Sequence, residues 1–385
     1  MERIEADWLT SKATQAVFAL LADAGHQVYA VGGCVRNTLL GVRVKDIDLA
    51  TDARPDRVVG LAKASGLQAI PTGISHGTVT VLSDGVAFEI TTFRKDVETD
   101  GRRAVVAYSD RIEDDARRRD FTMNALYCDR NGKVFDPLGG YPDLKARHLR
   151  FIDDAEARIR EDYLRSLRYF RFYAWYGNPE EGFDPDALAA IAGNTDGLSD
   201  LSRERIGMEM KRLLEAPDPA PAVAGMRSTG VLPILLPGAD DRALASLVAF
   251  EERGGARPNA MRRLAVLGGE DVANRLRLSR RDAERLVQIR QNVGLPAAEL
   301  GYRLGVELAQ DVILVGAAST GAPLVESDLK AAAHGAAQVF PVTAADLMPE
   351  MEGPALGKAL ERLRSDWIAS GFALDRATLI ARRQG

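Results

Sequence analysis

The sequence predicts an α+β protein in which a mixed head of strands and helices precedes an all-helical remainder. Three observations support this prediction. Over roughly the first 150 residues, short apolar runs typical of strands alternate with glycine and proline turns and with short helical patterns. Beyond that point, apolar residues recur almost throughout with helical spacing. A chain of 385 residues is also too long for one ordinary core, which indicates more than one domain.

Each element of the head is predicted from a local pattern. Amphipathic spacing indicates helices, Gly25 and Gly41 end two of them, and residues 83–85 supply the turn of a hairpin. In chain order we expect a helix over residues 1–25, a strand over 27–31, a helix over 34–41, a strand over 46–51, a helix over 54–66, a hairpin over 76–94, a segment over 114–129 that is helical at its centre, and a strand with a Gly/Pro turn over 132–144.

The remainder is divided by composition. Clear helical periods occupy residues 162–177, 202–216, 280–294 and 356–371, and the Pro/Ala-rich stretch 215–225 is predicted to be a joint. We therefore predict three parts, which are a head over residues 1–149, a helical neck over 150–215, and a helical body and tail over 216–385.

Composition excludes several classes of protein. With 46% hydrophobic and 27% charged residues, the chain has the composition of a soluble globular protein. No apolar run is long enough to span a bilayer, and the charged N-terminus lacks a secretory apolar region. Two isolated cysteines, Cys34 and Cys128, give neither a disulfide framework nor a zinc-ligand spacing. We therefore expect a cytoplasmic protein that does not associate with membranes.

The charge is unevenly distributed. A formal net charge of −5 argues mildly against a nucleic-acid-binding protein. Arginine-rich segments nevertheless lie at residues 117–122, 158–172 and 274–290. A local basic surface can bind phosphates even when the whole chain is acidic, so phosphate or nucleic-acid binding stays open.

Two carboxylates stand two residues apart on a predicted strand. Side chains alternate along a strand, so Asp46 and Asp48 share one face and Ile47 points to the other. Carboxylates this close repel one another unless a cation lies between them, and such hard oxygen ligands suit Mg²⁺. The alternative is a solvated strand end, and the spacing alone does not choose between the two.

A third acid is predicted on the second strand of the hairpin. In "VAFEITTF", alternation puts Glu89 on the opposite face from Phe88 and Ile90. Together with the two aspartates, Glu89 could complete a site of three acids holding two metals, as used for phosphoryl or nucleotidyl transfer. The alternative is an exposed strand acid.

The segment "GGCVRN" supplies groups that bind anions. Gly32 and Gly33 allow backbone amides to approach a triphosphate closely, and Arg36 lies in the first turn of the following helix. A double glycine alone is a weak signal. It is not a Walker loop, since no G-K-[ST] follows, and it is not the G-x-G-x-x-G dinucleotide fingerprint.

Taken in order, six motifs give a specific resemblance. The segments "GGCVRNTLLG", "KDIDLAT", "EITTFR", "RRDFTMNAL", "DPLGGYPDL" and "REDYLRSLRYFRF" resemble the class II nucleotidyltransferase family, which holds tRNA CCA-adding enzymes and bacterial poly(A) polymerases within the DNA-polymerase-β-like superfamily. The match covers residues 25–215, with weaker helical similarity beyond. It implies a polymerase-β-like catalytic head, a neck that recognises the nucleotide base, and a body and tail that bind tRNA.

The resemblance also implies roles for individual residues. Asp46 and Asp48 would be the Mg²⁺ ligands, with Glu89 as the third catalytic acid. Nucleotide contacts would come from the glycine turn and from the arginine-rich motifs, at Gly32, Gly33, Arg36, Arg119, Asp120, Asn124, Asp162, Arg165, Arg168 and Arg171. One departure is Asn37, where the family usually has Asp, which puts any role of that charge in doubt.

The spacing in "EDYLR" also allows base recognition to be argued from chemistry. Asp162 and Arg165 are three apart, and so would be neighbours on one helix. Cytosine and adenine each show an amino donor beside a bare ring nitrogen, so a carboxylate beside an arginine accepts both and rejects uracil and guanine. The alternative is a surface ion pair between these two residues. The aromatic residues between 169 and 176 are expected to pack rather than to stack on bases.

Two further segments are given roles by the resemblance. Residues 93–110 are expected to form a flexible polar loop, with Asp100, Arg102 and Arg103, that favours addition of the terminal A. The basic helix at 274–290 is the candidate for contacting the tRNA backbone, although a solvated helix face is as good an explanation for any single arginine.

The leading interpretation is therefore addition of C, C and A to tRNA 3′ ends from CTP and ATP, with Mg²⁺ as cofactor and tRNA as partner. The sequence leaves protein partners unknown. A poly(A) polymerase is the nearest rival, but the expected "GRRF"-like signature is replaced by "AIPTGISHGTVTV". A non-catalytic RNA-binding relative is the third possibility. None of the four histidines is followed by Asp, so a His-Asp phosphohydrolase activity is not expected.

Overall fold

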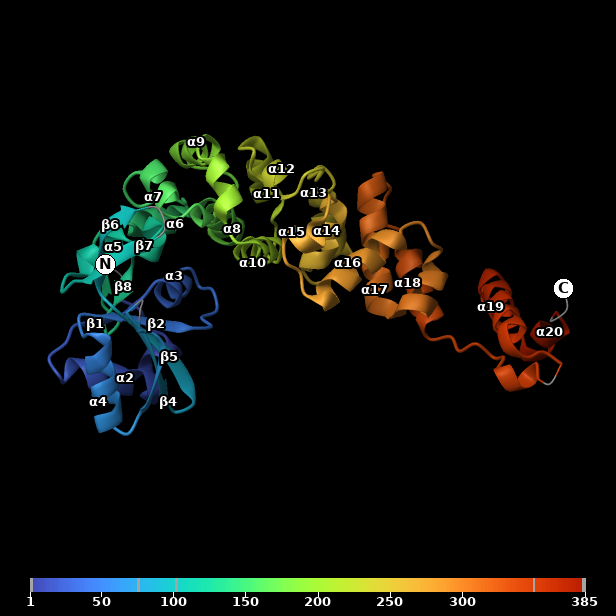
Figure 1. The fold of residues 1–385 in the computed structure, drawn as a ribbon, viewed down its shortest axis with the longest axis horizontal. Coiled ribbons are helices and arrows are strands. Elements are labelled where there is room, and N and C mark those ends of the chain that lie inside the picture. Colours follow the sequence, from blue (N-terminus) through green and yellow to red (C-terminus); the bar gives the residue numbers. More distant parts are fainter. Residues whose placement is uncertain (1–2, 75–76, 101–102, 349, 383–385) are drawn as a thin grey trace. The chain divides into compact units, whose positions relative to one another are not determined.

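A computed structural model describes residues 3–74, 77–100, 103–348 and 350–382 (Figure 1). The chain divides into two compact units. The first comprises Met1–Arg205 and Ser228–Ile234, and the second comprises Ile206–Arg227 and Leu235–Gly385. The division confirms an α+β head followed by helices, because every strand of the described chain lies in the first unit. The predicted limits of head, neck and body stay predictions.

The first unit is built on a seven-stranded sheet with the order β3-β4-β5-β2-β1-β8-β9 (Figure 1). Its strands are β1 Val28–Val31, β2 Ile47–Thr51, β3 Gln68–Gly73, β4 Thr78–Ser83, β5 Val86–Thr92, β8 Tyr127–Cys128 and β9 Val134–Phe135. The pairing of β2 with β5 is parallel, and each of the other pairs is antiparallel. This parallel pair at the centre of the sheet aligns the two strands that carry the predicted acids.

The β4–β5 hairpin confirms the sequence prediction. Its turn residues Asp84 and Gly85 both have positive φ, 47° and 77°. Two successive left-handed residues form the type I′ turn whose twist matches paired strands, and Asp-Gly is a favoured pair for it. Burial alternates along β4 as the pattern predicts, since Val79 and Val81 are buried. The turn chemistry therefore fixes the register of β5.

Helices surround this sheet. They are α1 Asp7–Thr10, α2 Lys12–Ala22, α3 Gly33–Leu39, α4 Pro55–Ala64, α5 Ile112–Arg117, η2 Thr122–Asn124, α6 Tyr141–Ala146, α7 Ala155–Glu161, α8 Leu164–Tyr176, α9 Pro185–Gly193 and η3 Thr195–Asp200, with most of α12 Val231–Leu235. Helices α2 and α4 contact the sheet at β1, β3 and β4, while α3 contacts β1 and β2. The short helix α3 is thereby fixed beside the strand that carries Asp48.

Three local predictions were wrong. The helix expected over residues 1–25 is two helices, because Ser11 leaves helical geometry and caps α2 through a bond from Thr14 N. The loop expected over residues 93–110 contains a two-stranded sheet of β6 Arg94–Asp100 and β7 Arg103–Tyr108, and Arg102 lies outside the described residues. The helix expected at the centre of 114–129 ends at Arg117, and a 3-10 turn follows.

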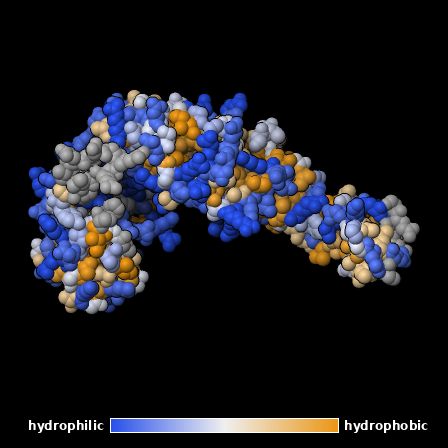
Figure 2. Space-filling model, in the orientation of Figure 1, coloured by the Kyte–Doolittle hydropathy of each residue, from blue (hydrophilic) through white to orange (hydrophobic). Residues whose placement is uncertain are grey.

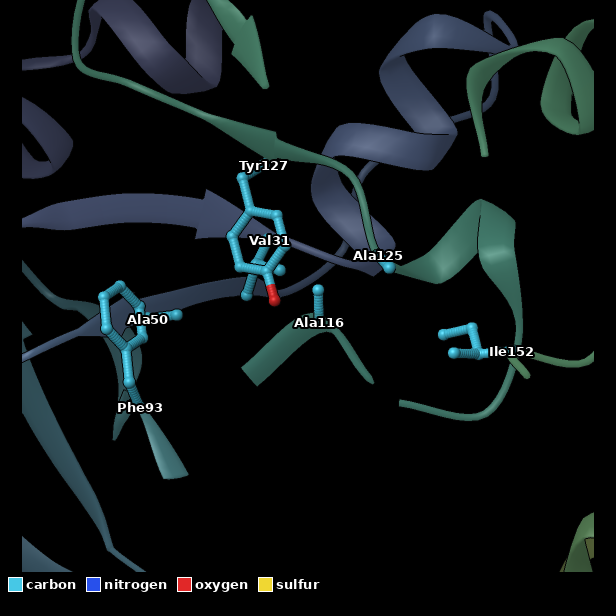
Figure 3. Close-up of a cluster of buried hydrophobic side chains, with 7 residues drawn as sticks. All are labelled: Val31, Ala50, Phe93, Ala116, Ala125, Tyr127 and Ile152. Carbon is cyan, nitrogen blue, oxygen red and sulfur yellow. The ribbon is translucent and has the colours of Figure 1, made fainter. Parts of the chain in front are cut away.

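A buried apolar cluster lies behind the motif at 118–124 (Figure 3). It brings together the sheet, α5 and the segment leading into α7, through Val31, Ala50, Phe93, Ala116, Ala125, Tyr127 and Ile152. The Tyr127 ring is fully buried, and its hydroxyl points away from the strand in Figure 3. The cluster anchors residues 118–124 on both sides, so their polar side chains are held at fixed positions.

The second unit is all-helical, as the periodicity predicts. Its helices are most of α10 Arg203–Leu214, then α11 Ala220–Ser228, α13 Leu244–Arg253, α14 Ala260–Leu267, α15 Val272–Arg275, α16 Arg280–Gln291, α17 Ala297–Thr320, α18 Glu326–Ala336, η4 Ala344–Asp346, α19 Gly353–Ala369 and α20 Arg376–Ala381. A separate apolar cluster around Leu363 and Trp367 forms the core of its C-terminal part.

The surface is mainly hydrophilic. Figure 2 shows hydrophobic residues gathered in separate patches on the visible face. Exposed apolar side chains of the second unit include Val287, Val306 and Val339. Within the described residues, no helix combines the length and apolarity needed to cross a membrane.

The second unit has charged side chains inside its core. Glu251 is 3% exposed, and it accepts from Arg262 Nε at 2.7 Å and from Arg263 Nη2 at 2.7 Å. Asp311, 1% exposed, accepts from Arg262 Nη1 at 2.7 Å and pairs with Arg285 at 2.7 Å. These bonds tie α13, α14, α16 and α17 together. Because each buried charge has a partner of opposite sign, the network tolerates loss of a member poorly.

We predict that Glu251→Ala lowers the free energy of unfolding of the second unit by about 3–5 kcal/mol, because the buried guanidinium groups of Arg262 and Arg263 both lose the Glu251 carboxylate and only Arg262 keeps another, that of Asp311. The control is Glu252→Ala, which removes an exposed acid from the next position of the same helix. Its effect is expected to stay within about 0.5 kcal/mol. Urea denaturation followed by circular dichroism measures both, and equal midpoints for the two variants would contradict the prediction.

Candidate active site

The predicted acids are brought together at one end of the central strands. Asp48 is the second residue of β2 and pairs in parallel register with Glu89 of β5. Asp46 lies just before β2, and Ile47 between the two aspartates is 9% exposed. Phe88 on β5 is buried and Glu89 is exposed, so the predicted alternation holds at the acids, although Ala50 and Thr51 at the end of β2 are both buried. Asp48 and Glu89 therefore occupy neighbouring positions on the face of the sheet opposite Ile47 and Phe88.

These acids destabilise one another. Burial, together with the charges of Glu89 and Asp46, raises the pKa of Asp48 to about 6 against the opposing charge of Arg119. The described residues contain no group of three or more His, Cys, Asp or Glu side chains already arranged to hold a metal. The donor set nevertheless fits a hard cation, because a positive charge beside Asp48 would relieve both the repulsion and the burial penalty.

The glycine turn before α3 faces two arginines. Gly32 adopts φ 70° and ψ −119°, a conformation that side chains disfavour, which explains glycine there. A Cβ placed on Gly32 would lie 3.5 Å from Arg119 Nη1, and one placed on Gly33 would lie 3.9 Å from Arg36 Nη2. Two guanidinium groups thus lie close to the turn formed by Gly32 and Gly33, where no side chain covers the backbone.

Arg119 is held by two groups that sequence reasoning missed. Asp115, 1% exposed, accepts from Arg119 Nη2 at 2.9 Å and from the Tyr127 hydroxyl at 2.8 Å. Arg119 Nε in turn donates to the Tyr127 hydroxyl at 3.2 Å. The spacing of Asp115 and Arg119, four residues apart, was a signal that could have found the first of them. Their contacts leave Nη1 directed at Gly32.

Asp120 and Asn124 form a second polar group. Asp120 Oδ1 accepts from Asn124 Nδ2 at 2.9 Å, and Oδ2 accepts from Arg168 Nε at 2.8 Å. Burial raises the pKa of Asp120, but the Arg168 charge and the hydrogen bonds outweigh it and bring the pKa to about 2. Asp120 is therefore ionised at neutral pH, and it pairs with an arginine that was predicted to contact the nucleotide itself.

Arg36 is buried among neutral groups. It donates to Asn37 Oδ1 at 2.8 Å and 3.1 Å, to the Tyr176 hydroxyl at 2.9 Å, and to Asn124 Oδ1. Burial lowers the pKa of Arg36. At the position where the family usually has Asp, Asn37 thus keeps the hydrogen bond but removes the negative charge.

The predicted base-reading residues are arranged differently from the expectation of one helix. Asp162 ends α7 in an extended conformation, with φ −154°, and Arg165 lies in the first turn of α8. Asp162 Oδ2 accepts from Arg205 at 2.7 Å. Arg165 donates to the Arg158 carbonyl at 2.8 Å and to the carboxylate of Glu161. The alternative prediction of a surface ion pair between Asp162 and Arg165 is therefore wrong, because each side chain pairs with a different residue.

The neck helix α8 confirms most of the packing expected of its aromatic residues. Tyr169, Phe170, Phe172 and Tyr173 are each at most 5% exposed. The exception is Trp175, which is 40% exposed. The buried aromatic residues thus fix α8, and Arg168 and Arg171 lie beside the ring of Phe172.

The basic segment 274–290 forms two helices, and several of its arginines bind the protein. Arg280 pairs with Glu284 at 2.8 Å, Arg285 pairs with Asp311, and Arg290 donates to the Leu264 carbonyl at 3.0 Å. These three arginines have structural partners within the second unit. A tRNA contact by this segment stays a prediction.

Family models match two parts of the chain. Residues 28–150 match the poly(A) polymerase head domain, and residues 182–242 match a model described as the probable RNA and SrmB-binding site of polymerase A. The first match contains the acids, the glycine turn and the 118–124 motif. These are the same residues that the structure places together.

Comparison with individual proteins extends the match. The mitochondrial CCA tRNA nucleotidyltransferase 1 of Mus musculus is 32% identical over 97% of this chain and 90% of its own length. The Geobacillus stearothermophilus CCA-adding enzyme is 40% identical over 57% of this chain, and the alignment spans about half of that relative, 52%. The human mitochondrial enzyme is 42% identical over 54% of this chain, and its alignment covers 48% of that protein.

Solved structures show the same fold. The Bacillus stearothermophilus CCA-adding enzyme in complex with CTP superposes with a TM-score of 0.78 and 28% identity, covering 97% of this chain and 96% of that chain. The Thermotoga maritima CCA-adding enzyme complexed with tRNA has the fold at a TM-score of 0.71 and 19% identity. Sequence identity along nearly the whole chain, the shared head and the shared fold agree: this protein belongs to the family of CCA tRNA nucleotidyltransferases and poly(A) polymerases.

Proposed function

We propose that the protein adds C, C and A to the 3′ end of tRNA from CTP and ATP without a nucleic-acid template. The observation that carries this proposal is the placement of Asp48 and Glu89 beside a glycine turn flanked by Arg36 and Arg119. That arrangement puts groups for metal and for triphosphate in one unit. Family membership supplies the reaction, since relatives that align over most of the chain are named CCA tRNA nucleotidyltransferases or CCA-adding enzymes.

Nucleotidyltransferases generally use a divalent metal ion. We propose Mg²⁺, held by Asp46 and Asp48 with Glu89 as the third catalytic acid. When bound, the metal supplies activation of the attacking 3′ hydroxyl and neutralisation of the leaving pyrophosphate. The support from this chain is chemical, because carboxylate oxygens are hard donors, and a cation beside Asp48 would offset the burial and the neighbouring acids that raise its pKa.

The proposed triphosphate contacts come from the other side of the site. Backbone amides at Gly32 and Gly33 can approach phosphate oxygens closely, and Arg36 and Arg119 supply positive charge there. Asp120, Asn124, Arg168 and Arg171 are proposed to bind the nucleotide as well. The bonds of Asp120 to Asn124 and to Arg168 hold these three side chains in place before a substrate arrives, which reduces the entropy lost on binding.

Base selection is assigned to Asp162 and Arg165. Their side chains are 34% and 15% exposed, so the carboxylate is the more accessible of the two. A carboxylate that accepts from an amino group and a guanidinium that donates to a ring nitrogen select cytosine and adenine. We propose that Glu161 orients Arg165 for this task, since it already accepts a bond from that guanidinium.

We also propose the division of labour along the chain. Residues 1–149 would catalyse, residues 150–215 would recognise the base, and residues 216–385 would bind tRNA. The probable RNA-binding model at residues 182–242 supports RNA contact near the boundary between the last two parts. A cytoplasmic location stays a prediction.

A poly(A) polymerase is the second candidate, because the matched head model carries that description. Incubation of the pure protein with Mg²⁺ and a tRNA lacking its 3′ end, with CTP and ATP singly and together, distinguishes the two. We expect two C additions followed by one A. A long ladder of A would establish the second candidate instead, and arrest after two C residues would contradict addition of the terminal A by this protein alone.

Asp48→Ala is predicted to reduce nucleotide incorporation by at least about a thousandfold, because loss of a metal-ligating carboxylate removes several kcal/mol of transition-state stabilisation. Binding of tRNA, measured by fluorescence anisotropy, should change less than about twofold. The control Asp56→Ala removes an exposed acid on α4. Extension of tRNA by the Asp48 variant at the unmodified rate would show that the metal ligands are elsewhere.

The stability of the metal-free protein is predicted to depend on Asp48 ionisation. Its pKa rises from 3.8 when unfolded to about 6 when folded, so stability present below pH 4 is lost as pH rises through 6. Asp48→Asn removes the ionisable group and therefore this loss of stability, which amounts to about 2–3 kcal/mol. We expect the variant to melt higher than the unmodified protein at pH 8 in EDTA and equally at pH 4.

Addition of Mg²⁺ provides the matching measurement. At pH 8 the ion should raise the melting temperature of the unmodified protein and leave that of Asp48→Asn nearly unchanged, because one ligand is missing. A thermal shift of equal size in both proteins would mean that the stabilising Mg²⁺ binds at another place.

A further inference from the structure

Arg36 carries a charge that its protein contacts do not neutralise. The residue is 6% exposed, and the guanidinium acceptors named above are amide or hydroxyl oxygens, from Asn37, Asn124 and Tyr176. The nearest carboxylate in this series of bonds is that of Asp120, which is reached through Asn124 and is already paired with Arg168. A buried cation with neutral partners is unfavourable unless an anion arrives.

Two aromatic rings of α8 also hold Arg36. Its guanidinium carbon lies 4.0 Å from the centroid of the Tyr176 ring and 5.1 Å from that of Phe172. Both distances fall within the range of cation–π attraction. The Phe172 ring is shared, because Arg168 and Arg171 lie 5.3 Å and 4.4 Å from its centroid. Three cations therefore gather around the Phe172 ring, and residues 168–176 of α8 include no carboxylate.

The two aromatic residues are four apart, so they stand on one face of α8. The same helix begins directly after Asp162 and Tyr163, and it carries Arg165 in its first turn. Arg36 belongs to α3, and its guanidinium lies beside Gly33. The helix that is proposed to read the base thus also fixes a cation at the proposed phosphate site.

We propose that Tyr176, with Phe172 beneath the same guanidinium, is a positioning residue that holds Arg36 at the Gly32–Gly33 turn for the triphosphate. This inference rests on the proposed function in one respect, that Arg36 binds phosphate. Neutral partners suit the task, because they fix the guanidinium by hydrogen bonding and ring stacking and leave its charge for the substrate. Placing these groups on α8 couples the position of the phosphates to the helix that selects the base.

Tyr176→Phe tests the hydroxyl, and Tyr176→Leu tests hydroxyl and ring together. We expect KM for CTP and for ATP to rise by the same factor, about 3- to 10-fold for Phe and more for Leu, since one hydrogen bond to the cation is lost. Inhibition by pyrophosphate should weaken by that factor, whereas kcat and the rejection of UTP should stay within about twofold. Equal changes for both nucleotides follow because the phosphates are common to them.

The control is Tyr173→Phe, which removes a hydroxyl from the same helix where the ring stacks on Phe183 at 3.9 Å instead. It should leave KM and pyrophosphate inhibition unchanged. Melting temperatures of all variants are compared in parallel. A lower melting temperature for Tyr176→Leu with unchanged KM and unchanged pyrophosphate inhibition would show a purely structural role and overturn the inference.

Calorimetric titration of the full chain with Mg²⁺-pyrophosphate separates this inference from the proposed function. If the unmodified protein binds pyrophosphate and Tyr176→Phe binds it several-fold more weakly, the positioning role stands even if no tRNA is extended. Equal affinity in both proteins overturns the positioning role while nucleotide addition can still be observed. Failure of the unmodified protein to bind pyrophosphate overturns it as well.

Discussion

The first unit is organised around a separation of charge, with carboxylates on one side of the proposed site and guanidinium groups beside the Gly32–Gly33 turn on the other. Parallel pairing of β2 with β5 forces Asp48 and Glu89 into neighbouring positions, where they repel. On the other side of the site, Arg36 and Arg119 approach the glycines that precede α3. The two sets of charge do not pair directly in the contacts of this structure. Arg119 has Asp115 as its carboxylate partner, whereas the hydrogen-bond partners of Arg36 are neutral. A metal ion beside the acids and a polyphosphate beside Arg36 would balance the remaining charges.

The remaining polar groups of the head keep these charges in place. Asp115 and Tyr127 hold Arg119, while Arg168 holds Asp120. Behind them, the apolar cluster that includes Tyr127 fixes the backbone on which they stand. Such preorganisation is what nucleotidyl transfer requires, because the protein contributes chiefly position and electrostatics to this chemistry.

The second unit uses charge differently. Its buried arginines, Arg262 and Arg263, are matched by Glu251 and Asp311, so that no excess charge remains among these four. Paired buried ions specify how helices pack and do not await a ligand. Arg36 differs from Arg262 and Arg263, because its hydrogen-bond acceptors are amide and hydroxyl oxygens rather than carboxylates. The surroundings of an arginine, more than its presence, indicate a functional role.

Much of the fold could be predicted from local patterns. The β4–β5 hairpin, α3 with its glycine stop, and the helical remainder followed from turn chemistry and periodicity. These signals are local, so tertiary contacts rarely override them. The errors came where a capping residue or a strand register decided the outcome. Ser11 divided the first helix, Asp162 ended α7, and the segment after Phe93 paired with itself instead of forming a loop.

By itself, the sequence determined which residue types could carry the chemistry, because alternation placed Asp48 opposite Ile47 and Glu89 opposite Phe88, and the motif order identified the family. Only the tertiary structure decided their partners. The hydrogen bond between Arg36 and Tyr176 joins residues that are 140 positions apart in the sequence. The bond between Arg168 and Asp120 joins residues that are 48 positions apart. Contacts at such separation depend on how α8 packs against the head, and packing is set by the whole core rather than by any local pattern.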